Sequence, residues 1–294
     1  MDNQTLWELV RKAWTKINKL YQPVVDPFLQ ELSLDWRIMG LLLAVLTFEP
    51  EDTTPGHLTV RGPYTSPEEY LKRLELATEK GMLNGTGENR FRLTAKGRQI
   101  AQDFIRLARQ AMDTGNPLFV PDTSQLAEYM RRLVFTSVES PPPPDKWSIK
   151  LSMKLLPEEK DSLSYIEQTF SCMGAYRDDS HLAAWQSSGL SATALETLTL
   201  VWRDEASSLD QLYEKLSYRG YTRQVYADAI AELRDRKYLS GALSALRLTH
   251  EGQRFRQRVE DTTNKYFFAP WACLDVQERK SLAGLLTQLW DNLP

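Results

Sequence analysis

Apolar residues recur at the period of an α-helix along most of the chain, and turn-forming residues separate the runs. The clearest series lies in the last hundred residues. There Ser191, Ser208 and Thr222 each precede a run with one apolar face, and such residues commonly cap helix starts. After these three predicted helices, residues 238–249 contain two short apolar pieces around Ser-Gly, which predicts a β-hairpin. A long helix capped by Thr249 and a final leucine-rich helix complete the series.

Part of this series occurs twice. The letters FRLTAKGRQIAQDF at 91–104 return as LRLTHEGQRFRQRVE at 246–260, and the segments before them match in order and spacing. Repetition of a whole supersecondary unit indicates an internal duplication. In the first copy, the helix expected at 35–48 is apolar nearly all round, so another element must enclose it. The amphipathic stretch 5–21 is suited to that role, and a hairpin is expected at 83–94.

The first copy differs from the second after its first helix. Only residues 49–65 stand before the next predicted helix, and Pro55 and Gly56 leave little room for a full second helix. We therefore expect a degenerate copy. Between the copies, residues 113–186 predict two helices around four consecutive prolines, Pro141 to Pro144. The stiff extended conformation of such prolines favours a spacer, with a ligand for a proline-binding protein as the alternative.

Composition narrows the class of protein. At 294 residues and 42% hydrophobic content, the chain can form one or two cores. No apolar run approaches the roughly 20 residues that span a bilayer, and the start MDNQTLWELVRK lacks the features of a signal peptide. A cytoplasmic protein with no membrane partner is therefore expected. Cys172 and Cys273 have no metal-ligand spacing, so we expect two buried, reduced thiols.

The chain contains few signals of enzyme chemistry. Three histidines stand apart from one another, and HExxH, GxSxG, P-loop and dinucleotide motifs are absent from the sequence. We therefore expect neither an enzyme nor a cofactor or metal site. Asp178, Asp179 and His181 are close together before Trp185, which would suit a metal or proton-transfer group. An acidic helix start capped by Asp179 or Ser180, with Trp185 buried, is the favoured interpretation.

Positive charge gathers on the two repeated units. Residues 61–98 and residues 219–254 each carry a net charge of +3, whereas the whole chain carries −3. The remainder therefore sums to −9. This asymmetry suits a DNA-facing side, although it is small beside the roughly six to ten phosphate contacts of a tight DNA binder. Ordinary solvated helix faces are the alternative.

In its order of elements, the C-terminal part resembles winged helix-turn-helix proteins of the MarR-like type. In that family an L-T-x-x-G step leads from the hairpin, called the wing, into a helix, and a leucine-rich terminal helix beginning L-x-x-x-E-R belongs to the dimerisation region. Residues 248–252 and 274–289 match these features. We therefore predict a mainly α-helical fold with two winged-helix units in tandem. The predicted divisions are an N-terminal degenerate unit with its leading helix at 1–118, a helical, proline-containing connector at 119–186, and a C-terminal unit at 187–294.

The resemblance implies a DNA-binding transcriptional regulator. Arg223 and Gln224, on the early face of the third helix together with Asp228, would face base edges, and Arg219 and Arg247 would neutralise phosphates. Arg90 and Arg92 are the corresponding candidates at the first hairpin.

Two further partners are expected from the sequence. The leucine stripe of the last helix needs a partner surface, which could be the long helix at 250–267, the amino-terminal helix or the same helix of a second subunit, and we favour the homodimer. Eight tryptophans and twelve tyrosines leave room for a small aromatic effector, although core packing explains most of them. The alternative function is a winged-helix module that binds a protein or a small molecule and no DNA.

Overall fold

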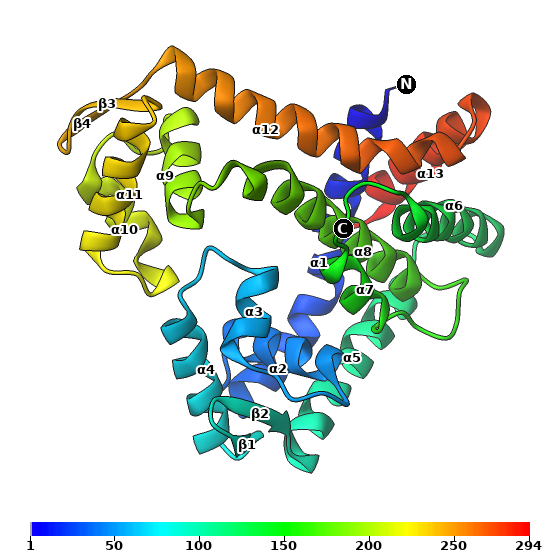
Figure 1. Cartoon of the computed structure of the whole chain (residues 1–294). Helices are drawn as coiled ribbons and strands as arrows, with labels where there is room; N and C mark the ends of the chain where they lie inside the picture. Colours follow the sequence, from blue (N-terminus) through cyan, green and yellow to red (C-terminus); the bar gives the residue numbers. More distant parts are fainter. Residues whose placement is uncertain (1) are drawn as a thin grey trace.

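Helices form most of the protein, and two small antiparallel hairpins are attached to them (Figure 1). The computed structural model describes residues 2–294. The first half of the chain contains α1 (Asn3–Glu31), α2 (Trp36–Phe48), α3 (Pro55–Arg61), α4 (Pro67–Glu79), β1 (Leu83–Gly87), β2 (Arg90–Leu93), α5 (Ala95–Thr114) and α6 (Val120–Glu139). After the short helix α7 (Trp147–Met153), the second half contains α8 (Leu163–Trp185), η1 (Gln186–Ser188), α9 (Ala192–Trp202), α10 (Leu209–Leu216), η2 (Ser217–Arg219), α11 (Arg223–Asp235), β3 (Leu239–Ala242), β4 (Ala245–Leu248), α12 (His250–Phe268), η3 (Ala269–Cys273) and α13 (Val276–Asn292).

The two halves repeat one order of elements. Each has a long helix, three further helices, a hairpin, a second long helix and a final helix. Ser33 and Gly189, two residues before the N-caps of α2 and α9, both have a left-handed backbone, with φ of 52° and 66°. The repeat therefore includes α1 with α8 and α6 with α13, well beyond the stretch in which the letters agree.

The repeated L-T-x-x-G letters form the junction between each hairpin and the long helix after it. In the second half, Thr249 Oγ1 accepts a hydrogen bond from the Gly252 amide (3.0 Å), and the Thr249 amide donates to the Tyr238 carbonyl (3.1 Å). Thr94 and Gly97 repeat the capping bond at 2.9 Å. A Cβ on either glycine would overlap the carbonyl oxygen of the residue before the hairpin. The letters recur because both junctions need a capping hydroxyl and a residue without a side chain.

Each half covers a helix of the other half. Helix α1 packs against α5 of its own half and α13 of the second, whereas α8 packs against α12 and against α6 of the first. Leu282, Leu286 and Leu289 of α13 are fully buried in this arrangement. The prediction that the leucine stripe joins two subunits is wrong, because α1 and α6 of the same chain cover it.

The apolar core is divided differently from the predicted units. A large cluster takes in buried residues between 6 and 176 and returns between 267 and 293, whereas a smaller cluster lies between 185 and 259. The predicted connector is therefore not separate, because α6 and α8 belong to the large core. The smaller cluster holds α9, α10, α11 and the second hairpin. None of the helices in the described part of the chain is long and apolar enough to cross a bilayer.

Two local expectations are corrected. The first half does have a second short helix, since α3 has seven residues against eight in α10. Thr54 caps it and Pro55 takes the first helical position, where a missing N–H and a fixed φ suit a helix. The proline run does not extend between separate bodies. The Tyr176 hydroxyl donates to the Pro142 carbonyl (3.0 Å), and Pro143 is buried.

The hairpin junction makes a stability prediction. Replacing Gly252 by Ala forces the backbone of the junction to move away from the Tyr238 carbonyl, and overpacking of this kind costs about 1–3 kcal/mol. Gly284→Ala is the matched control, because Gly284 lies in α13 with open space around its Cβ position, and Ala favours a helix over Gly. Urea unfolding should show a lower free energy of unfolding for Gly252→Ala and an equal or higher one for Gly284→Ala. Equal stability of the two variants would contradict the account.

Candidate functional site

The start of α11 presents an open polar face. Thr222 caps the helix, and Arg223, Gln224 and Asp228 are exposed on it. Arg223 Nη2 lies 2.7 Å from Asp210 Oδ1 of α10, and Gln224 Nε2 donates to Asp228 Oδ1 at 2.8 Å. Exposed pairs of this kind are worth little free energy, so an incoming acceptor can replace them.

The predicted arginines of the two hairpins are also exposed, but they lie apart. Arg247 is on β4, whereas Arg90 and Arg92 are on β2. Arg92 forms an ion pair with Asp52 (2.7 Å). Figure 1 shows the two hairpins at separate extremities of the molecule, so these arginines do not form one continuous patch.

Arg219 lies in a different environment from the other predicted contact residues. Its guanidinium is 2.8 Å from Glu196 Oε1, 4.8 Å from the centre of the Tyr218 ring and 3.4 Å from Thr65 Oγ1. About a quarter of the Arg219 side chain is exposed (26%). Arg219 therefore holds elements together, and its geometry does not support the predicted phosphate contact.

The turn before α11 is joined to the start of α4. The Ser66 amide, at the N-cap of α4, donates to the Arg219 carbonyl at 2.8 Å. Gly220 has a left-handed backbone (φ 80°) and packs so closely on Glu69 that a Cβ would overlap it. Thr65 and Ser66 are buried by this contact. The N-cap of α4 is therefore covered, whereas Pro67 and Glu68 directly after it are exposed, as are Arg223 and Gln224 at the start of α11.

A charged cleft of about 310 Å³ lies next to these joined turns, which contribute Tyr64 and Arg219 to its lining. It is bounded by α8, α9 and α12 and by the turns that precede α4 and α11. The lining includes four arginines and three carboxylates, together with polar and aromatic groups: Arg177, Arg203, Arg219, Arg256, Asp178, Glu196, Glu260, His181, Thr199, Thr263, Tyr64 and Leu200.

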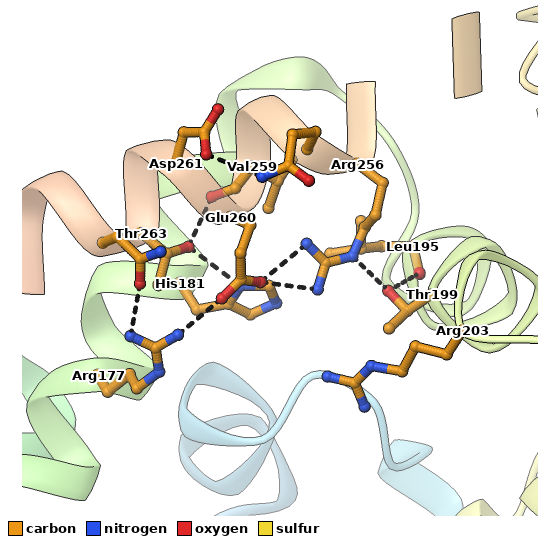
Figure 2. A network of polar contacts seen from close by, with 12 residues as sticks. Arg177, His181, Leu195, Thr199, Arg203, Arg256, Val259, Glu260, Asp261 and Thr263 are labelled. Carbon is orange, nitrogen blue, oxygen red and sulfur yellow. Dashed lines mark hydrogen bonds and ion pairs between the residues drawn. The ribbon is translucent and has the colours of Figure 1, made fainter. Parts of the chain in front are cut away.

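One carboxylate organises two of the arginines (Figure 2). Glu260 accepts from Arg177 at 2.7 Å through one oxygen and from Arg256 at 3.1 Å through the other. Arg256 also donates to Thr199 Oγ1 (3.0 Å), and its guanidinium lies 4.8 Å from the centre of the Trp202 ring. This network fixes the α8, α9 and α12 walls of the cleft relative to one another.

A directed chain of hydrogen bonds joins the halves beside this network. The Thr263 hydroxyl donates to the Val259 carbonyl (2.7 Å), so it can accept from His181 Nδ1 (3.3 Å). His181 Nε2 then accepts from the Tyr64 hydroxyl (3.0 Å). Burial, and then the nearby arginines of the cleft, lower the pKa of His181 to about 4, although Glu260 opposes the shift. The imidazole is therefore neutral at neutral pH and has one donor and one acceptor nitrogen.

Two charged groups of the cleft lack strong partners within residues 2–294, and a third has one unpartnered oxygen. Asp178 has neither a hydrogen bond nor an ion pair, and Arg203 has only Glu205 at 3.8 Å. Figure 2 shows Arg203 extending from α9 without a bonded neighbour among the residues drawn. The third group is Glu196, whose Oε2 is buried without a partner and whose pKa is raised by burial against the opposing effect of Arg219.

The predicted cluster of Asp178, Asp179 and His181 is divided between two roles. All three lie inside α8, so the expected helix start is wrong. Asp179 accepts from the Ser148 and Ile149 amides (2.9 and 3.0 Å) and so caps α7, whereas the other two line the cleft. Across residues 2–294, no three or more His, Cys, Asp or Glu side chains are placed to hold a metal ion.

Sequence reading did not single out Arg177, Arg203, Arg256 or Glu260, because the four come from three helices that are distant in the chain. Arg256 and Glu260 are four residues apart and share one face of α12, which by itself is an ordinary helical ion pair. A stronger signal would have been the comparison of the two copies position by position.

The neutral His181 predicts how stability depends on pH. In the unfolded chain the imidazole takes up a proton below about pH 6.5, whereas in the folded protein it does so only near pH 4. His181 therefore does not lower the free energy of unfolding above pH 6.5, but it lowers it by up to about 3 kcal/mol as the pH falls to 4. Urea unfolding across this range should show a flatter pH dependence for His181→Asn than for wild type. His250→Asn, at an exposed histidine, is the control and should leave the pH dependence unchanged.

Comparison with known proteins gives one match. A helix-turn-helix family matches residues 152–293, which run from the end of α7 to the last residues of the chain. No curated protein and no solved structure matches the chain. The matched part includes α9, α10, α11 and the second hairpin, so the second half of the chain contains a helix-turn-helix domain.

Proposed function

We propose that the protein is a DNA-binding transcriptional regulator of the MarR-like winged-helix type, with two winged-helix units in one chain. The observation that carries the proposal is the open start of α11 inside the helix-turn-helix domain, with Arg223 and Gln224 exposed. Bidentate side chains at the start of a recognition helix can contact base edges in the major groove. Arg247 on the adjacent hairpin is exposed and would contact a phosphate.

The two units differ in what they can offer to DNA. Paired recognition helices that enter successive major grooves stand roughly 34 Å apart. Here the start of α4 is bonded to the turn before α11, and the first turn of α4 carries Glu68 and Glu69. We therefore propose that α11 is the reading helix and that the first unit supports it. Arg90 and Arg92 would contact DNA only if the first hairpin also reaches the duplex.

Two features of the proposal concern assembly and ligands. Because each half covers the other, one chain already contains the helical contact that a pair of subunits would form, so a homodimer is not needed to complete the core. Responsiveness to a small aromatic effector remains a prediction from the aromatic content. The charged lining of the cleft behind the turns favours a charged ligand instead.

A protein-binding module without DNA is the second candidate. It is favoured by the acidic neighbours of the reading face, since Asp210 and Asp228 hold Arg223 and Gln224. Their negative charge would repel phosphates in the same place.

A DNA-binding assay separates these functions. Electrophoretic mobility shift with genomic fragments at low salt should show binding that weakens steeply as the salt concentration rises. Arg223→Ala should lower the affinity roughly ten- to a hundredfold, because one bidentate base contact is worth about 1–3 kcal/mol. Asp210→Asn should raise it, because Arg223 is released and a negative charge is removed.

The control for this assay is Arg131→Ala, at a surface arginine of α6 that pairs with Glu128 of its own helix. It should bind DNA as wild type does. Absence of binding to any fragment near 50 mM salt, or equal losses in Arg131→Ala and Arg223→Ala, would favour the protein-binding module.

A further inference from the structure

The internal repeat allows the cleft to be compared with the same place in the first half. The two halves align on Ser33 with Gly189 before the second helix, and on Thr94 with Thr249 before the long helix. The equivalent place in the first half is a cavity of about 190 Å³ between α1, α2, α5 and α8. Four residues that line it correspond to four that line the cleft.

Those equivalent residues are mostly apolar. In the alignment, Tyr21, Leu43, Ile105 and Ala108 of the first half stand where the second half has Arg177, Thr199, Glu260 and Thr263. Beside them, Val25 and Ala101 stand where the second half has His181 and Arg256.

The comparison shows that these aligned positions can hold uncharged side chains, although Arg109 and Glu167 also line the first-half cavity. Charged groups that are removed from water cost free energy, and replacing a buried ion pair by well-packed apolar residues is often neutral or stabilising. Arg256 is only 2% exposed, yet the second half retains it together with Glu260. A polar cleft that packing does not require indicates a ligand.

We propose that the cleft binds a small zwitterion, a molecule with one anionic group and one ammonium group, of which a free amino acid is the simplest example. Arg203 and Asp178 are the two lining charges without strong partners; both are exposed, so a ligand can reach them, and they have opposite signs. Arg203 binds the anionic group and Asp178 the ammonium group. The volume, near the lower end of ligand pockets, suits a molecule of this size.

The other charged groups of the cleft are less available. Arg177 and Arg256 share Glu260, and Arg219 is bonded to Glu196, so these three arginines are each held by a carboxylate and together keep one net positive charge. A simple anion can pair with Arg203 only and a simple cation with Asp178 only, whereas a zwitterion can pair with both lining charges. The unpartnered Oε2 of Glu196 can accept a further donor of the ligand after a small rotation.

Binding is tested on the full chain by isothermal titration calorimetry with three kinds of probe. Glycine, L-glutamine and L-phenylalanine carry both charges at increasing size, acetate carries only the anion, and ethylammonium only the cation. We expect saturable binding of at least one amino acid and none of acetate or ethylammonium. Arg203→Gln and Asp178→Asn should each weaken it at least tenfold, whereas the surface controls Arg131→Gln and Asp161→Asn should not change it.

A second variant replaces the polar set by its first-half counterparts: Arg177→Tyr, Arg256→Ala, Glu260→Ile and Thr263→Ala. We expect this variant to remain folded by circular dichroism and to lose amino-acid binding. Binding of acetate or ethylammonium as tightly as the amino acids, no binding of any probe, or unfolding of the substituted variant would overturn the proposal. None of these measurements involves DNA, so the proposed ligand can be confirmed or rejected independently of the proposed DNA binding.

Discussion

The burial of the first helix of each half by the last helix of the other half is the constraint on which the rest of the structure depends. Leu6, Val10 and Ile17 of α1 are fully buried, and α13, which comes from the far end of the chain, is one of the helices that cover α1. Helix α6 covers α8 in the same way. Separation of the halves would expose both apolar faces to water. The long helices therefore form one base, from which the hairpins and their short helices project (Figure 1).

This base also determines how the two projecting parts meet. The chain brings the turn before α4 against the turn before α11, where one backbone hydrogen bond and the close packing of Gly220 on Glu69 join them. A side chain at position 220 would have to displace this contact. The N-cap of α4 is therefore held against the turn before α11, whereas the start of α11 is exposed and carries polar side chains.

Much of the fold could be predicted from the amino-acid sequence, whereas the contacts of the candidate site could not. Helix caps and the L-T-x-x-G junctions are local, so residues such as Thr222 and Gly252 indicate their structure without tertiary information. The role of Arg219 depends on Glu196 and Thr65, which local pattern does not reveal. The leucine stripe of α13 predicts that the helix is covered by a partner, but its periodicity does not say whether that partner belongs to the same chain.

The charged cleft is informative because the chain contains its own comparison. Ala101 and Ile105 occupy in α5 the positions that Arg256 and Glu260 occupy in α12, so the charged pair is a property of one half and not of the fold. Tyr64 and Arg219 line the cleft and also belong to the joined turns. A ligand in the cleft would therefore contact residues from both halves.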